Sequence, residues 1–297
     1  MKINLKRRSM KKKQLFFFSM IILAGMMAEW SCKKDDNEKV ATKQDATSVA
    51  KKDAVSNAAY NDVYSQSEDI VSNLENDNYP ATSSKKSASV TGTYVITVTN
   101  SGNTTDFPKV ITVVYNNYLT NNGIKKNGTV KITQSAKMRE SGAIRTVSLD
   151  NYTVNDTIKL EGKVTITNMG LVSAKPSVKA ELANGKMTFT NSGFYMTRSF
   201  TRTITWESGF DLISLLYIWD DVYSFNETAN GTTSNGFSYS STTSVPLEYK
   251  IGELCIKKGK LDLSIGSIKA YVDFTRESCS EKVKLFVEGD TEDFNIW

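Results

Sequence analysis

A period of two in hydrophobicity, running from Thr91 to the end of the chain, is the feature that most constrains the fold. β-Branched and aromatic residues alternate with polar ones in segments such as Thr93–Thr99 and Val110–Tyr115, and Asn- and Gly-rich turns separate the segments. No segment of helical periodicity interrupts them, which favours pairing between successive strands. The pattern predicts an all-β domain over residues 91–297, a long antiparallel meander of about twelve to fourteen strands. Alternation alone does not distinguish a half-barrel, a barrel and a sandwich.

One helical pattern precedes the predicted sheet. Its apolar residues recur at spacings that place them on one face of a helix: Val55, Ala59, Val63, Ile70 and Leu74. We therefore predict one amphipathic N-terminal helix over residues 47–76. Residues 32–46 have no apolar pattern and are expected to form a flexible tether. Residues 77–90 are rich in Ser and low in bulky side chains, which is typical of a linker.

The last hairpin can be read in register from its alternation. A two-residue turn at Gly266-Ser267 makes one face of the hairpin apolar and the other polar, and a slip of one residue would destroy both patterns. Extended to the ends of the hairpin, this register brings Cys255 within one residue of Cys279. A single β-bulge would join the two sulfurs, so we predict a disulfide. Two buried free thiols are the alternative.

The first 31 residues have the composition of an export signal. Seven Lys and Arg residues precede an apolar segment, Leu15–Met27, whose 13 residues are too few to cross a bilayer. Cys32, preceded by the small residue Ser31, resembles the cysteine that is acylated in bacterial lipoproteins. The residues that follow it, Lys33–Asp36, resemble the start of mature lipoproteins of Bacteroidota. This resemblance implies a signal peptide over residues 1–31, lipid attachment at Cys32, and anchoring in the outer membrane, at the cell surface rather than the periplasmic face.

Removal of this signal changes the charge balance. The whole chain has 37 Lys and Arg residues and 32 Asp and Glu residues, a net charge of +5. Residues 32–297 keep 30 basic and 31 acidic residues, a net charge of −1, because seven basic residues and one acid lie in residues 1–31. A basic chain would indicate nucleic acid as a partner. The mature chain is close to neutral, so we expect no nucleic-acid partner and predict the membrane as a partner only through the N-terminal lipid.

The chemistry of most enzymes is missing from the sequence. The chain has no histidine, which excludes Ser-His-Asp and Cys-His catalysis and any metal site built on imidazole. It also has no phosphate-binding Gly loop, zinc spacing or dinucleotide fingerprint. The carboxylates that remain are Asp220-Asp221, which would point to opposite faces of a strand, and the cluster Glu288–Asp293, typical of a solvated turn or of a hard-cation site. We expect no catalytic residue, no metal and no cofactor.

Two segments have the composition of a binding site. Arg and aromatic residues alternate on one face of a predicted strand, at positions Arg198, Phe200, Arg202 and Trp206. Such a face suits stacking on sugars or contact with a protein, and the alternative is a face on which Arg stems cover apolar neighbours. The second segment is the most apolar of the mature chain, and it is either core or an exposed apolar patch that contacts a membrane or a partner. Its large apolar residues include Phe210, Leu212, Ile213, Leu216 and Trp219.

Two further resemblances bear on location. Asp156-Thr157-Ile158 resembles the short O-glycosylation site of Bacteroidota, with Thr157 as the acceptor, although the start of a strand explains the triplet equally well. Trp206-Glu207, Asp220–Tyr223, Pro246–Glu248 and the cysteine pair together resemble uncharacterised β-rich surface lipoproteins of Bacteroidota. That resemblance implies an all-β shape and an envelope location, and it implies no activity.

These observations predict a non-enzymatic, lipid-anchored envelope or cell-surface protein whose sheet binds a glycan, a polymer or an envelope protein. A first alternative is a carrier that holds an apolar ligand or lipid in a half-barrel cavity under the N-terminal helix. A second alternative is a carboxylate-dependent hydrolase that uses the acidic cluster. Its candidate residues are Glu288, Asp290, Glu292 and Asp293.

Overall fold

The computed structural model describes residues 39–76, 82–85, 91–99, 106–120, 123–209, 221–250 and 255–296. Apart from Lys39, these residues belong to one compact unit, Val40–Trp297, which contains the helix α2 (Lys43–Asn76) and fourteen strands. The strands are β1 (Thr82–Lys85), β2 (Thr93–Val98), β3 (Lys109–Leu119), β4 (Lys125–Gln134), β5 (Ile144–Val154), β6 (Ile158–Val172), β7 (Lys175–Phe189), β8 (Tyr195–Ser208), β9 (Val222–Thr232), β10 (Ser238–Lys250), β11 (Ile256–Ile265), β12 (Ile268–Asp273), β13 (Val283–Val287) and β14 (Asp290–Phe294).

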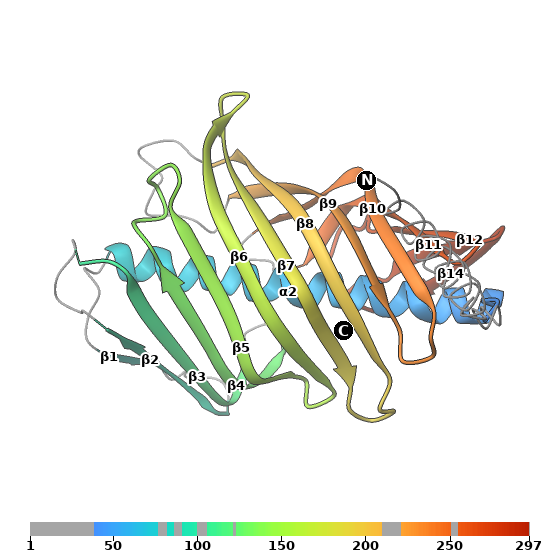
Figure 1. The fold of residues 1–297 in the computed structure, drawn as a ribbon, viewed down its shortest axis with the longest axis horizontal. Helices are drawn as coiled ribbons and strands as arrows, with labels where there is room; N and C mark the ends of the chain where they lie inside the picture. The colour runs from blue at the N-terminus through green and yellow to red at the C-terminus, as the bar shows by residue number, and fades with distance from the viewer. Residues whose placement is uncertain are drawn as a thin grey trace, which may run out of the picture. The chain divides into compact units, whose positions relative to one another are not determined.

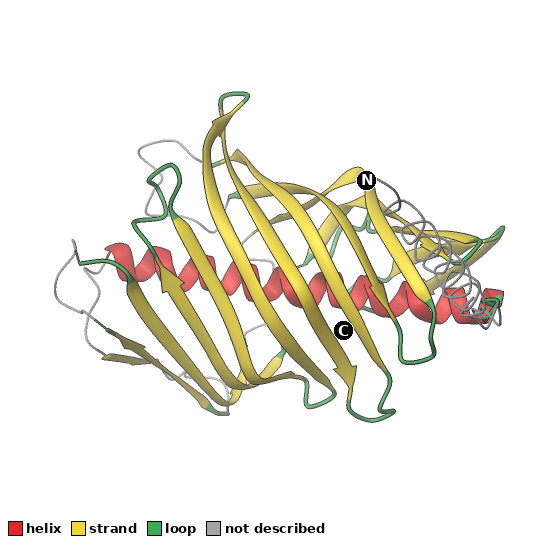
Figure 2. Cartoon of the chain, in the orientation of Figure 1, coloured by secondary structure: helices red, strands yellow, loops and turns green. Residues whose placement is uncertain are grey.

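The sheet is a single antiparallel meander. Every described strand pairs with its neighbours in the sequence, in the order β1 to β14, and the described strands do not close into a barrel. This confirms the predicted all-β class with one N-terminal helix. Figure 1 shows the sheet curving around α2, which crosses the strands along their inner side, and Figure 2 shows that α2 is the only helix drawn among the described residues. No helix in this part of the chain combines the length and the apolar character needed to cross a membrane.

The N-terminal boundaries differ from the predicted ones. Helix α2 begins at Lys43, inside the predicted tether, because Thr42 and Asp45 form a capping box. The backbone N–H of Asp45 donates to the Thr42 hydroxyl at 3.2 Å, and the backbone N–H of Thr42 donates to the Asp45 carboxylate at 3.0 Å. The predicted linker also contains a strand, since β1 pairs with β2. A Ser-rich segment can still form a short edge strand where a partner strand supplies the hydrogen bonds.

Helix α2 is more buried than an amphipathic surface helix. Every residue from Ala59 to Ser65 is buried, polar ones included. Contacts with the sheet run along its whole length, from Lys43, which pairs with Asp290 of β14 at 2.5 Å, to Glu75, which accepts a hydrogen bond from Gln134 of β4. The apolar residues predicted to lie on one face of the helix therefore make only part of the contact between α2 and the sheet. The polar side of the helix is buried as well, and charged residues on the inner face of the sheet match it.

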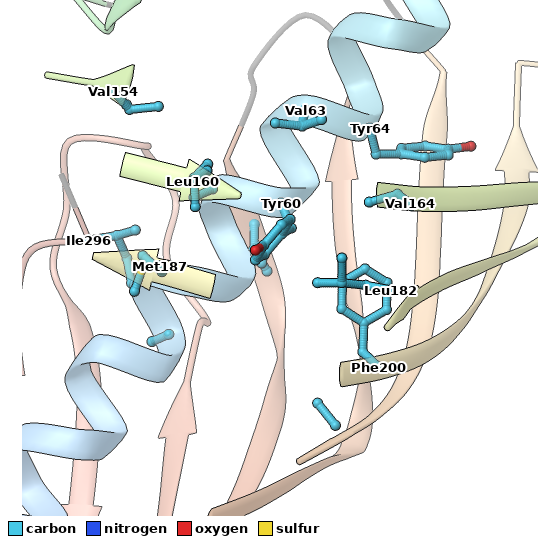
Figure 3. Packing of buried hydrophobic residues seen from close by; sticks show 14 of the residues in the cluster. Tyr60, Val63, Tyr64, Val154, Leu160, Val164, Leu182, Met187, Phe200 and Ile296 are labelled. Carbon is cyan, nitrogen blue, oxygen red and sulfur yellow. The ribbon is translucent and has the colours of Figure 1, made fainter. Parts of the chain in front are cut away.

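Tyr60 shows how closely the helix approaches the sheet. Its hydroxyl donates to the backbone carbonyl of Glu161 at 2.8 Å, and its ring lies edge-on to Phe200 with the ring centroids 6.0 Å apart. Figure 3 shows Tyr60 among the core residues of α2 and of the strands that cover it. Gly185 of β7 lies beneath the ring, where an added Cβ would be 2.7 Å from the Tyr60 hydroxyl and 2.5 Å from Leu182. A larger residue at this position would therefore displace the side chains of Tyr60 and Leu182.

The C-terminal hairpin has the predicted register. Ile265 pairs with Ile268, and the pairing continues to the end of β12, where Lys260 pairs with Asp273. Cys255 and Cys279 form a disulfide with their Cα atoms 5.8 Å apart, which confirms the prediction. The 24-residue separation between the two cysteines makes this bond a staple across the base of the hairpin.

Candidate functional site

The face that the sequence marked for sugar or protein binding lies inside the molecule. Arg198 and Arg202 of β8 are each about 1% exposed, and Phe200 between them is buried. All three point toward α2 rather than toward solvent, so the prediction of an exposed binding face is wrong for these residues. Among the four predicted positions, only Trp206 retains partial exposure.

The two arginines belong to a buried network, which we define as Asp53, Asn57, Arg198, Arg202 and Glu227. Arg198 pairs with both Asp53 and Glu227, and Arg202 donates to the Glu227 carboxylate from Nε at 2.9 Å and from Nη2 at 2.6 Å. Asn57 adds a third donor to Glu227, at 2.8 Å. Two cations of β8 are therefore matched by two acids, Glu227 on the neighbouring strand β9 and Asp53 across the helix–sheet interface on α2, as buried charges require.

Electrostatics keep Glu227 ionised. Burial raises the pKa of its carboxyl group, but Arg202 and Arg198 lower it by more, so the pKa lies below its ordinary value. The pKa of Asp53 is instead raised, because burial outweighs the attraction of Arg198. Further along the helix, Lys126 of β4 pairs with the buried Asp62 at 2.6 Å. The charged groups pair with one another, although Oδ2 of Asp53 and Nε of Arg198 make no hydrogen bond among the described residues. We therefore assign the network to holding the helix in register rather than to ligand binding.

The candidate site is a cavity of about 370 Å³ between the C-terminal half of α2 and strands β6 to β9. We call it the helix–sheet cavity. It has the size of a small-molecule site, and apolar side chains make most of its wall. The principal apolar residues around it are Tyr64, Val71, Met138, Val178, Ile204 and Trp206.

Stacked aromatic rings form one wall of the helix–sheet cavity. The indole of Trp206 stacks on the ring of Tyr223, with centroids 5.6 Å apart and an angle of 16° between the planes. Tyr223 in turn stacks on Tyr249 at 5.6 Å and 18°. Burial raises the pKa of Tyr223 well above its ordinary value, so its phenol stays neutral. The stacked rings hold one another in place, so Trp206 and Tyr223 form a rigid wall against which an apolar body can pack.

Carboxylates form the polar part of the cavity. Glu68 pairs with Arg145 at 2.6 Å, and Glu75 accepts a hydrogen bond from the backbone N–H of Met138 at 3.0 Å. Asp221, which is buried, also lines the cavity. Arg139 is the one cationic side chain among the described lining residues. Acceptors therefore outnumber cations at this wall, which favours a ligand that brings hydrogen-bond donors or a positive charge.

The acidic cluster at the C-terminus has a structural explanation. Asp290 pairs with Lys43 of α2 at 2.5 Å, and Glu292 pairs with Lys51. The carboxylates thus face lysines of the helix at separate points, and no group of residues in the described part of the chain is arranged to hold a metal ion. Asp221 lies apart from this cluster, at the cavity. Its neighbour Asp220 lies outside the described residues.

Several other predicted positions can be placed. Thr157 is half-buried in the turn before β6, where Asn155 and Asp156 both have positive φ, so turn geometry accounts for the polar residues at this point. Cys32 lies outside the described residues. The positions named for the possible apolar patch also lie outside them, namely Phe210, Leu212, Ile213, Leu216 and Trp219.

Apart from Trp206, the residues of the helix–sheet cavity are not predicted by any pattern in the sequence. Its wall is assembled from α2, the segment between β4 and β5, and four strands, so no local motif records it. Strand alternation does place Tyr223 on the inner face of the sheet. It does not indicate which residues lie opposite Tyr223. Comparison of the chain with protein-family models, with curated proteins and with solved structures gave no match.

Proposed function

We propose that this chain is a non-enzymatic, lipid-anchored envelope or cell-surface protein that binds a small amphipathic ligand in the helix–sheet cavity. The observation that carries the proposal is the pairing of a stacked aromatic wall with an acceptor-rich wall in one ligand-sized cavity. The proposal narrows the apolar-carrier hypothesis, because α2 and the buried network fill much of the remaining inner face of the described sheet.

The charges of the cavity define the ligand class. Glu68, Glu75 and Asp221 would repel a carboxylate headgroup, and they would accept hydrogen bonds from an ammonium or a hydroxyl group. We therefore expect the ligand to have an apolar body and a cationic or hydroxyl-bearing head.

A matched set of amphiphiles tests this function. Octylammonium and octanoate have tails of the same length and opposite charge, and octyl glucoside has a neutral hydroxyl head. We expect octylammonium and octyl glucoside to bind at least tenfold more tightly than octanoate, which corresponds to about 1.4 kcal/mol. Intrinsic fluorescence reports binding near the indole of Trp206, and the Trp206→Phe variant assigns the signal to that residue.

A cavity-filling variant supplies the control. Val178 lines the cavity, whereas Val95 is exposed on β2, outside it. We expect Val178→Phe to lose binding and Val95→Phe to keep it, with both variants folded by circular dichroism. Equal binding by the two variants, or equal affinity for octylammonium and octanoate, would refute the cavity as the site.

The anchor is tested separately. The proposal predicts that cells fed labelled palmitate incorporate it into the wild-type chain and not into a Cys32→Ser variant. Labelling of both chains, or of neither, would remove the lipid anchor from the proposed function and would leave the cavity unaffected.

A further inference from the structure

The outer face of strands β8 to β10 carries no charged side chain over most of its area. Every outward-facing residue from Thr197 to Thr205 is Ser or Thr, and every one from Asn226 to Thr232 is Asn or Thr. On β10 the outward-facing residues from Ser238 to Thr242 are again Ser or Thr. This is the reverse side of the strand whose Arg and Phe residues are buried against α2.

The register aligns these side chains into rows that cross the sheet. One row consists of successive partners on β8 to β11, namely Ser199, Asn230, Ser240 and Ser264. It joins two hollows on the outer face. One hollow, of about 390 Å³, is lined by Ser199 and Asn230, and the other, of about 820 Å³, is lined by Ser240 and Ser264.

A parallel row ends in aromatic rings. Its successive partners from β8 to β13 are Thr201, Thr228, Thr242, Asp262, Tyr271 and Phe286. At roughly 4.8 Å between neighbouring strands, this row is about 24 Å long. We call the two rows together the outer strip.

The larger hollow holds the aromatic end of the outer strip. The rings of Tyr271 and Phe286 are half-buried and stack with their centroids 4.3 Å apart and an angle of 13° between the planes. The charged residues that line this hollow are Asp262, Lys269 and Glu288, so both signs are present. Asp262 accepts a hydrogen bond from Ser244 at 2.8 Å, and Lys269 donates one to Ser264 at 2.7 Å. The hollow therefore combines an apolar ring surface with hydroxyl groups, two acids and one lysine.

We infer that the outer strip binds an extended, neutral polysaccharide chain. Thr side chains are stiff at χ1, so their hydroxyl groups are already ordered and lose little conformational entropy when they bind a hydroxyl-rich ligand. The two rings stack on each other and Lys260 Nζ lies over Tyr271, 5.5 Å from its centroid, so the flat surface for the C–H face of a sugar ring is the face of Phe286 turned away from Tyr271. A linear row of this length suits a polymer rather than a single sugar.

Other partners fit the outer strip less well. Nucleic acid and anionic polymers require clustered Lys and Arg residues, which β8 to β10 do not present on this face between residues 197–205, 226–232 and 238–242. A protein interface draws most of its affinity from large apolar, aromatic or Arg side chains at its centre, and the centre of this strip consists of Ser, Thr and Asn. The strip lies on the opposite face of the sheet from the helix–sheet cavity, so this inference does not rest on the proposed function.

Affinity gel electrophoresis of the full chain tests the inference. The gels contain laminarin, yeast mannan or soluble starch as neutral polymers, and polygalacturonate as the anionic counter-probe. We expect at least one neutral polymer to retard the wild-type chain and polygalacturonate to leave it unchanged. Absence of retardation by all three neutral polymers, or retardation by polygalacturonate alone, would overturn the inference.

Matched variants locate the site. Thr228→Lys places a long cation in the outer strip, and Thr165→Lys makes the same change on the outer face of β6, outside the strip. We expect Thr228→Lys and the double variant Tyr271→Ala/Phe286→Ala to weaken retardation at least tenfold, and Thr165→Lys to behave as wild type. All variants are first compared by urea unfolding. If both strip variants are folded and are retarded as strongly as wild type, the polymer binds elsewhere. The same conclusion follows if the cavity-filling Val178→Phe chain is no longer retarded.

Discussion

Replacing Glu227 with glutamine tests whether the buried network holds α2 in the sheet. The Glu227 carboxylate is fully buried and accepts hydrogen bonds from Asn57, Arg198 and Arg202. Glutamine keeps the shape of the side chain and removes its charge, so Arg198 would keep the carboxylate of Asp53 and Arg202 would keep only the amide oxygens of Asn57 and Asn61 and the new amide of residue 227. Removing one partner of a buried ion pair typically costs about 3–5 kcal/mol. We expect the Glu227→Gln variant to lose about that much free energy of unfolding.

The measurement is urea unfolding followed by circular dichroism, with the free energy taken from the midpoint and slope. Glu248→Gln is the matched control, because the Glu248 carboxylate pairs with Lys258 at 3.1 Å on the surface of the adjacent strand. An exposed pair contributes about 0–1 kcal/mol. If the two variants lose the same free energy, the network does not stabilise the fold in the way proposed here.

The free energy lost in the Glu227→Gln variant should depend on pH. Because the folded-state pKa of Glu227 lies below its ordinary 4.5, its ionised form stabilises the folded chain above that value. This contribution is lost as the pH falls through the lowered folded-state pKa. Asp53 acts with the opposite sign, since burial raises its pKa and protonation favours the folded state. The informative quantity is therefore the difference between wild type and Glu227→Gln, which we expect to shrink on acidification from pH 7 to pH 3. A constant difference would contradict the assignment.

Three further outcomes concern stability and are measured by the same unfolding assay. Opening the Cys255–Cys279 disulfide with reductant should cost roughly 3 kcal/mol for its 24-residue loop, and an unchanged midpoint would argue against a stabilising role. Lys126→Met and Asp62→Leu should each cost about 3–5 kcal/mol, whereas the double variant should be markedly more stable than the sum predicts, because no buried charge is left unpaired. Strict additivity would show that the two groups do not interact. Thr42→Ala should cost about 1 kcal/mol through loss of the helix cap, and no loss would place the true cap elsewhere.

The elements recovered from the sequence are those whose pattern is local. Alternation predicts the antiparallel meander, and the Gly266 turn together with the faces of its hairpin fixes the register that brings Cys255 to Cys279. The start of α2 was missed, although Thr42 and Asp45 have the spacing of a capping box. This spacing indicates a helix start at residue 42 or 43, but the residues around it lack the apolar pattern from which the helix was predicted.

The faces of β8 show why alternation was insufficient for the site. The strand presents Arg and aromatic residues on one side and Thr and Ser on the other, and neither set is a plain apolar core face. Charged residues are ordinarily exposed, so the pattern of β8 does not indicate that its Arg side is the buried one. The structure buries the Arg side because Asp53, which lies 145 residues earlier on α2, supplies the opposite charge for Arg198. A pairing over that distance leaves no trace in the period of a strand.

The orientation of β8 also relates the two proposed sites to each other. Ile204 and Trp206 point inward and line the helix–sheet cavity, whereas Thr201, Thr203 and Thr205 point outward on the strip face. A ligand in the cavity and a polymer on the strip would therefore contact opposite faces of one strand without touching. The two can bind at the same time, and saturation with octylammonium should leave polymer retardation unchanged. Direct competition between them would require a shared surface, which the alternation of β8 does not provide.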